Sequence, residues 1–315
     1  MDVLTEVRRD ELDAHIARHE FFWLDLHSPS EEELERLGDL LGLHAMAMED
    51  TREFGQRAKV DVYDNHLLVV FFTARENGHA ERVAHPIEVH VYVSGDFIVT
   101  VRREACDLLD RLHEALAAQD ASAEDFIVYR IFDTLTDAWY PVINAVESRV
   151  DELEGQVLER ARREQLGRIY RIRQEVREHQ RLLADQRDHF HPTAEAIRGL
   201  PGLKQGAREY LRDVSDHLTQ VTGEFQRQND DLVSLASTYF NANADRLNRV
   251  ATRVTVAGTF FLLWTLVTGF FGQNFEYLVS NVGTKGDFLL FGVGGLALPT
   301  IALAILFWVK RRDWF

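Results

Sequence analysis

The sequence predicts a mixed α/β domain followed by long α-helices and two membrane-spanning helices. Three observations lead to this prediction. Strand and helix signals alternate over residues 1–120, charge is dense over residues 121–253, and residues 254–275 and 288–309 carry no charged side chain. About 20 apolar residues are enough to cross the hydrocarbon core of a bilayer. The predicted parts are an α/β domain at 1–120, a long-helix hairpin and stalk at 121–253, and a transmembrane domain at 254–315, with spans at about 254–274 and 288–309 and an outer loop at 275–287.

The first strand and helix are predicted just after residue 19. The stretch EFFWLDL at 20–26 is apolar and aromatic, as in a short buried strand. After it, Ser28 is placed to cap a helix, Pro29 suits the first helical position, and Glu31 completes a capping box. Leucines then recur at helical spacing, so we expect a helix in this stretch.

Strands dominate the next part of the chain. Residues 59–78 and 82–104 are rich in Val, Tyr, Phe and Ile, with turn signals at 76–78 and 94–96. A helical pattern follows at about 106–118. This order of strands and helices favours one mixed α/β domain.

Long helices are predicted from residue 123 onward. The pattern up to residue 189 indicates two helices joined by a bend near 159–164, and a hinge with Pro and Gly follows at 191–206. Residues 207–271 contain no proline, so we expect one continuous helix there, about 100 Å long at 1.5 Å per residue. Its inward positions recur every 3.5 residues, as in helices that pack lengthwise: Leu211, Val214, Leu218, Val221, Phe225, Gln228, Leu232, Leu235, Tyr239 and Ala242.

Charge distribution predicts the orientation in the membrane. The loop between the spans has a single lysine, Lys285, whereas basic residues flank the spans on their other side. By the positive-inside rule, both termini are expected in the cytoplasm, for a multi-pass protein of the cell membrane. The N-terminal stretch MDVLTEVRRDELDAH has no apolar segment of a secretory signal, and the single Cys106 excludes a disulfide framework. The flanking basic residues are Arg246, Arg249, Arg253, Lys310, Arg311 and Arg312.

Composition also bears on the class of function. The formal net charge of −16 disfavours nucleic acid as a partner and favours cations. The sequence contains no HExxH motif, Walker loop, CxxC pair or nucleophile elbow. An enzyme is therefore not expected.

One face of the first span carries small and hydroxylated residues. Such a stripe is typical of close helix packing in membranes, and it also suits the lining of a water-filled path. Periodicity does not separate the two interpretations. A pore would require a ring of copies with the first spans inside, and the second span, whose only polar side chain is Thr300, would then face lipid. The stripe consists of Asn248, Ala251, Thr252, Thr255, Gly258, Thr259, Leu262, Thr265, Gly269 and Gly272.

The end of the first span carries a family resemblance. Gly272-Gln273-Asn274-Phe275 resembles the Gly-Met-Asn signature of the CorA-type magnesium channel family, which includes the ZntB-like branch. Further similar segments occur in the same order along nearly the whole chain: FFWLDLHSPSEEELERLGDLLGLHAMAMED, QRAKVDVYDNHLLVV, IFDTLTDAWYPVINAVESRVDELE and the basic tail KRRDWF.

The resemblance implies a funnel-shaped homopentamer that conducts a divalent metal cation, most readily Mg²⁺ and also Co²⁺. Uptake would be driven by membrane potential. The outer mouth would consist of Gly272, Gln273 and Asn274, with Glu276 in the outer loop. Carboxamide oxygens can hydrogen-bond the waters of hydrated Mg²⁺, which sheds them reluctantly, without holding the ion too long.

The resemblance also assigns inner pore and regulatory positions. Thr265 and Asn248 match pore-lining polar positions. A hydrophobic gate is expected at Leu262, Val254, Ala251 and Gly258. Asp50 and Asp213 match two aspartates that bind regulatory Mg²⁺ between neighbouring subunits and so close the pore. Two facing carboxylates repel unless a divalent ion bridges them.

Two alternatives stay open. Gln273 replaces the methionine of the signature, and a ZntB-like Zn²⁺ transporter would have the same fold. A membrane-tethered scaffold or sensor that conducts nothing also fits the long helices. Flux measurements with a panel of divalent ions would separate these hypotheses.

Overall fold

The computed structural model describes residues 2–78, 82–117, 124–198, 207–273, 276, 280 and 283–314. The chain falls into two compact units. The first comprises Met1–Gln156 and Arg162–Ala236, and the second comprises Val157–Ala161 and Ser237–Phe315.

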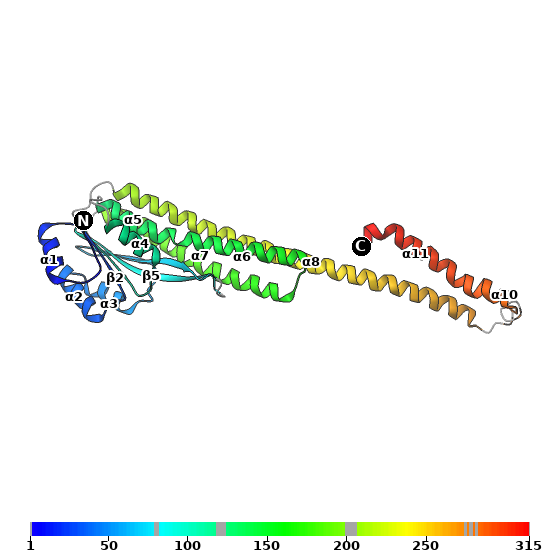
Figure 1. The fold of residues 1–315 in the computed structure, drawn as a ribbon. Helices are drawn as coiled ribbons and strands as arrows, with labels where there is room; N and C mark the ends of the chain where they lie inside the picture. The colour runs from blue at the N-terminus through cyan, green and yellow to red at the C-terminus, as the bar shows by residue number, and fades with distance from the viewer. Residues whose placement is uncertain are drawn as a thin grey trace. The chain divides into compact units, whose positions relative to one another are not determined.

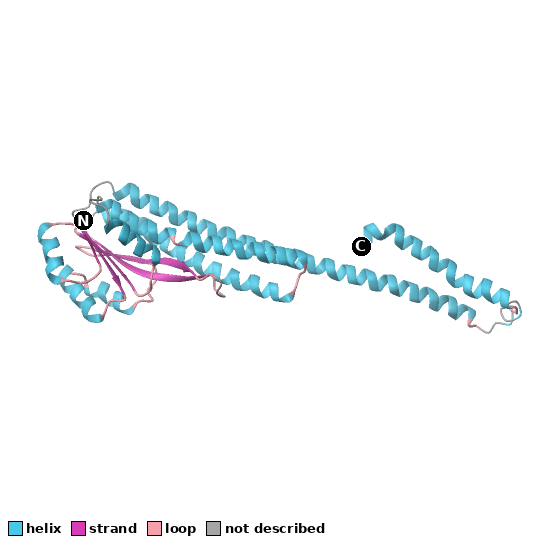
Figure 2. Ribbon diagram, viewed as in Figure 1, coloured by secondary structure: helices cyan, strands magenta, loops and turns pink. Residues whose placement is uncertain are grey.

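The first unit contains a six-stranded sheet that is flanked by helices (Figure 1 and Figure 2). The strand order is β1-β2-β6-β5-β4-β3, in which β1, β2 and β6 run parallel and the remaining neighbours run antiparallel. The predicted strands are confirmed, and β1 is an addition. The strands are β1 (Asp2–Leu4), β2 (Phe22–His27), β3 (Lys59–Val62), β4 (Leu67–Glu76), β5 (Ala84–Val93) and β6 (Phe97–Arg102).

Helices cover both faces of the sheet. Successive residues of a strand point to opposite faces, so the same strand supplies side chains that pack against helices on either side. Leu24 lies in an apolar core with residues of α1, α2 and α3. On the other face, the ring of Trp23 contacts His113 of α4, and Phe71 contacts Phe132 of α5 and Phe190 of α7. The bounds are α1 (Arg9–Arg18), α2 (Glu31–Leu41), α3 (Ala45–Glu53), α4 (Asp107–Ala117), α5 (Glu124–Asp137) and α7 (Arg163–Arg198).

The N-cap of α2 is Ser30, and Glu33 completes its capping box. The Ser30 hydroxyl accepts a hydrogen bond from the Glu33 amide at 3.3 Å, and the Glu33 carboxylate accepts one from the Ser30 amide at 2.8 Å. The predicted cap at Ser28 with Glu31 is therefore wrong by two residues. The Ser28 amide still donates to the Arg102 carbonyl at 2.7 Å, so the chain is bound to the sheet at that point and the helix begins later.

Replacing Ser30 with alanine is expected to lower the free energy of unfolding by about 1 kcal/mol, because the first turn of α2 loses its side-chain acceptor. Urea unfolding of the full chain in detergent measures this change. Ser28→Ala is the matched control, and an equal loss in both variants would contradict the placement of the cap.

The first unit also contains most of α6 (Trp139–Glu159), the N-terminal part of the longer helix α8 (Ala207–Phe271), and α7. α6 and α7 are separated near residues 160–162, which confirms the predicted bend. α8 is the predicted continuous helix. Its repeat positions from Leu211 to Tyr239 are buried, and Phe225 contacts the ring of Trp139 on α6. The 3.5-residue repeat thus predicts the packed side of α8 correctly.

The second unit contains the C-terminal part of α8 and a second apolar helical segment. That segment consists of α10 (Lys285–Asp287), η1 (Phe288–Val293) and α11 (Gly294–Trp314). The two helices contain windows with a mean hydropathy of 1.6 and 2.3, and neither window is buried within the chain. Both are long and apolar enough to cross a membrane. Their uncovered apolar surface is of a kind that soluble monomers rarely expose.

Candidate functional site

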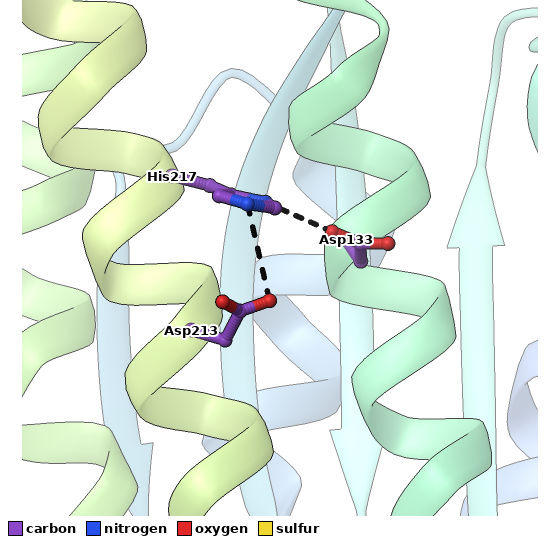
Figure 3. Close-up of side chains that lie close together, drawn as sticks. All are labelled: Asp133, Asp213 and His217. Atoms are coloured by element: carbon purple, nitrogen blue, oxygen red, sulfur yellow. Dashed lines mark hydrogen bonds and ion pairs between the residues drawn. The ribbon is translucent and has the colours of Figure 1, made fainter.

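Two carboxylates and an imidazole converge beside α8 in the first unit (Figure 3). Asp213 and His217 lie on α8, four residues apart, so both side chains project from the same face of the helix. Asp133 reaches them from α5. Helix α5 packs on the sheet through Phe132, the residue next to Asp133. This packing fixes the position of Asp133 relative to α8.

The ligand atoms of these three residues all lie within 4.8 Å of one another. His217 Nδ1 is 3.0 Å from Asp133 Oδ1, and His217 Nε2 is 3.9 Å from Asp213 Oδ2. The imidazole therefore bridges the two carboxylates (Figure 3). We call Asp133, Asp213 and His217 the three-residue cluster.

The cluster is closed on one side and open on the other. The Asp133 side chain is buried, whereas the Asp213 side chain is 49% exposed. The hydroxyl of Tyr129 donates a hydrogen bond to Asp213 Oδ2 at 3.0 Å and so orients this carboxylate. A cation could thus reach Asp213 from solvent while Asp133 is held in place.

Burial and nearby carboxylates raise the pKa of two groups beside the cluster. Partial burial, followed by the hydrogen bond to Asp213 and the charge of Asp133, raises the pKa of Tyr129 to about 12. Burial, followed by the charge of Asp133, also raises the pKa of Asp137. After burial, the nearby anionic charge is a further cause of both shifts, and a bound divalent cation would offset that charge.

The donor set fits a divalent metal ion. Carboxylate oxygens suit Mg²⁺, and an imidazole nitrogen adds a ligand that suits Co²⁺ and Zn²⁺ better than Mg²⁺. Three protein ligands leave further coordination positions for water or for a residue of another copy. The cluster can therefore hold an ion but does not surround it.

Asp50, the other predicted regulatory aspartate, lies on α3. Its Oδ2 is 2.6 Å from Lys59 Nζ, which is also 2.9 Å from Asp61 Oδ2. Partial burial alone would lower the pKa of Lys59, but hydrogen bonds to Asp50 and Asp61 raise it, so the side chain is an ammonium. The next residue, Thr51, is buried and bonds the Tyr92 hydroxyl at 2.7 Å, which anchors this part of α3 to β5.

Within one chain, Asp50 and Asp213 do not form a pair. Helix α3 belongs to the layer on one face of the sheet, whereas α5, which carries Asp133 and contacts Asp213, belongs to the layer on the other face. The structure brings Asp213 together with Asp133 and His217. An ion that touches both Asp50 and Asp213 would need two copies of the chain.

In the second unit, α8 and α11 contact each other through one side of α8. The indole N–H of Trp264 donates to the Thr300 hydroxyl at 3.0 Å, and the rings of Phe260 and Phe307 lie 5.9 Å apart. Thr300 is the only polar side chain that the sequence places in the second span, and here it accepts an interhelical hydrogen bond. The predicted pore and gate positions lie away from these contacts: Asn248, Ala251, Val254, Leu262 and Thr265 are exposed, and Gly258 is half-buried.

Several threonine hydroxyls on this helix donate to carbonyls of the same helix. Thr265 donates to the Phe261 carbonyl at 2.7 Å, and Thr252 donates to the Asn248 carbonyl at 2.8 Å. Because each hydroxyl hydrogen is used in this way, the lone pairs on each oxygen remain available as acceptors. Such a surface can accept hydrogen bonds from the waters of a hydrated cation.

Gly272 and Gln273 follow the end of α8. A Cβ atom on Gly272 would lie 3.0 Å from the Thr268 carbonyl oxygen, so this tight helix end favours glycine. Gln273 is exposed, and so is Glu276. Asn274 lies outside the described residues, and its role stays a prediction.

Comparison with known proteins places the chain in a family. The model of a family described as CorA-like Mg²⁺ transporter protein matches residues 18–312. The chain belongs to the CorA family. It is 24% identical over 292 residues to the cobalt/magnesium transport protein CorA of Thermotoga maritima, which covers 89% of this chain and 79% of that protein. It is also 24% identical over 302 residues to YfjQ of Bacillus subtilis, covering 94% of this chain and 90% of that protein.

Solved CorA structures share the fold. The complete structure of the CorA magnesium transporter from Methanocaldococcus jannaschii superposes with a TM-score of 0.73 at 20% identity, covering 93% of this chain and 91% of that one. The chain is thus a divalent metal ion transporter of the CorA family, and not an enzyme. Its two apolar helices are candidate membrane helices of such a transporter.

Sequence reasoning missed two residues of the cluster, Asp133 and His217. The spacing of four residues between Asp213 and His217 is a local signal that could have found the second. Asp133 lies 84 residues before His217, and no local pattern joins them. Only the packing of α5 against α8 brings this carboxylate to the site.

Proposed function

We propose that five copies of the chain form a funnel-shaped channel that takes up Mg²⁺, and also Co²⁺, across the cell membrane. The first spans line the pore, and the second spans face lipid. The observation that carries the proposal is the small and polar face of α8, which lies away from the contacts with α11. Neither apolar window is buried within a single chain, so further copies of the chain and lipid can cover these surfaces.

The proposed pore has polar positions that interact with hydrated ions and a hydrophobic constriction that stops their flow. The back-bonded hydroxyl of Thr265 offers acceptor lone pairs to a hydrated ion, and Asn248 adds an amide nearer the cytoplasm. Among the gate positions, Leu262 has the largest side chain and is 74% exposed, so a ring of Leu262 supplies most of the hydrophobic constriction. Ala251, Val254 and Gly258 are smaller, so the proposed path is wider on the cytoplasmic side of the Leu262 ring.

The outer mouth is a ring of carboxamides from Asn274, with Gln273 beside it and Glu276 in the outer loop. Neutral amides bind the waters of Mg²⁺ without trapping the ion. With both termini in the cytoplasm, a divalent ion entering a negative interior gains about 4–5 kcal/mol per 100 mV, which suffices to drive uptake.

Regulation uses the three-residue cluster and Asp50. An intracellular Mg²⁺ ion would bind to the three-residue cluster of one copy. Asp50 of the neighbouring copy would then supply a further ligand to the same ion. Two observations support this: the cluster is open at Asp213, and Asp50 lies on the other face of the sheet, where only another copy can present it. Bound ions hold the copies in the closed arrangement, and their loss lets the α8 helices move apart.

Ion flux into liposomes tests the function. With an inside-negative potential, purified protein is expected to admit Mg²⁺ at a rate that increases with the potential and that Co²⁺ inhibits by competition. Protein-free liposomes and zero potential are the controls. The imidazole of His217 in the cluster is the observation that favours a second candidate, a Zn²⁺ transporter. Zn²⁺ uptake that requires a pH gradient would support this candidate, and no flux with any cation would support a non-conducting tether.

A further inference from the structure

Lys59 lies between two carboxylates at the position where Asp50 would receive a divalent ion. Its ammonium is 2.6 Å from Asp50 Oδ2 and 2.9 Å from Asp61 Oδ2. Lys59 and Asp61 are two residues apart on the edge strand β3, so their side chains project from the same face of the sheet. Asp50 meets them from α3. The arrangement resembles a carboxylate site in which an ammonium group occupies the place of the metal.

We infer that Lys59 is a tethered competitor of the regulatory ion, and that it sets the Mg²⁺ concentration at which Asp50 binds metal. The inference rests on the proposed regulatory role of Asp50. A divalent ion that coordinates Asp50 Oδ2 must displace the ammonium, because Lys59 Nζ lies 2.6 Å from that oxygen. Asp61 makes the displacement reversible, since it keeps hold of the ammonium after Asp50 releases it.

The surroundings of the three groups fit such an exchange. The side chains of Lys59, Asp50 and Asp61 are 28%, 22% and 37% exposed, so they are sheltered enough to interact and open enough for an ion to enter. The residue after Asp50, Thr51, is bonded to Tyr92, so α3 holds Asp50 in place while the flexible lysine moves. A lysine side chain can move its charge to Asp61 without a change in the backbone.

Charge at this site predicts two opposite effects. Lys59→Met removes the competitor and leaves Asp50 and Asp61 as an uncompensated carboxylate pair, so Mg²⁺ should bind at about three- to tenfold lower concentration. Asp61→Asn removes the acceptor that holds the displaced ammonium, so Lys59 stays on Asp50 and a higher Mg²⁺ concentration should be needed. Lys59→Arg keeps the charge and should change the midpoint by less than about twofold.

The test is a Mg²⁺ titration of full-length protein in detergent, read as the increase in thermal unfolding temperature and as protection from limited proteolysis. Both report ion binding without transport. Arg57→Met is the matched control, because Arg57 is an exposed cation two residues from Lys59 and outside the ion pair. An effect of Arg57→Met as large as that of Lys59→Met would overturn the inference. The loss of any nearby positive charge would then explain both effects.

Asp50→Asn separates this inference from the proposed function. If Asp50→Asn weakens the Mg²⁺ response and Lys59→Met leaves the midpoint unchanged, Asp50 is regulatory but Lys59 is no competitor. If Asp50→Asn responds to Mg²⁺ as wild type does, the regulatory role of Asp50 is wrong and the inference fails with it. Should Lys59→Met fold poorly, Asp61→Asn decides by itself, and a decrease or no change in its midpoint is contrary to the inference.

Discussion

Asn274→Ala is expected to reduce Mg²⁺ flux into liposomes by more than about tenfold. Each copy of the proposed ring would lose one amide that binds the water shell of the ion, and one such hydrogen bond contributes about 1 kcal/mol. In the proposed five-copy ring these losses would act on the same ion, so even partial additivity exceeds the 1.4 kcal/mol that corresponds to tenfold. The measurement is the initial rate of Mg²⁺ entry at fixed potential.

Two comparisons make this result interpretable. Asn241→Ala removes an exposed amide from α8 outside the span predicted at about 254–274, and it should conduct like wild type. The mass of each variant in detergent shows whether the copies still assemble. Wild-type flux through correctly assembled Asn274→Ala would mean that the mouth lies elsewhere.

Asp213→Asn is expected to weaken inhibition by internal Mg²⁺ at least about tenfold. This carboxylate is the exposed member of the three-residue cluster, and the substitution removes one of its two negative charges while keeping its size. A loss of 1.4 kcal/mol in binding a divalent ion corresponds to tenfold, and a close carboxylate is expected to contribute at least that much. Flux at a series of internal Mg²⁺ concentrations gives the inhibition midpoint.

Asp216→Asn is the matched control for this variant. Asp216 is an exposed carboxylate on the same helix and does not belong to the cluster. Its inhibition midpoint should stay within about twofold of wild type, since an exposed surface charge contributes little. A midpoint of Asp213→Asn equal to that of Asp216→Asn would show that the cluster does not sense Mg²⁺.

Periodicity predicted the elements that depend on local pattern. The continuous α8 follows from the absence of proline and from a repeat that marks its buried side as far as Tyr239. The strands follow from apolar runs between turn signals. The cap of α2 was misplaced because the competing interaction, the bond from the Ser28 amide to the Arg102 carbonyl, comes from a strand more than seventy residues away.

The site depends on contacts that the sequence pattern does not contain. Asp213 could be named only through the family resemblance, since a single aspartate on a charged helix is ordinary. Asp133 required the packing of α5 against α8, and the contact between Lys59 and Asp50 required the pairing of a helix end with an edge strand. Long-range packing, rather than propensity, decides which charged groups meet.

The placement of α3 and α8 in layers on opposite faces of the sheet limits the symmetry of any assembly bridged through Asp50 and Asp213. A twofold dimer would require both aspartates on one interface patch, whereas a head-to-tail contact lets one copy present Asp50 and the next present Asp213. Copies bridged in this way join head-to-tail. An open row of copies has an unpaired Asp50 at one end and an unpaired Asp213 at the other, until a ring closes. The closed ring holds as many bridging ions as it has copies, whatever that number is.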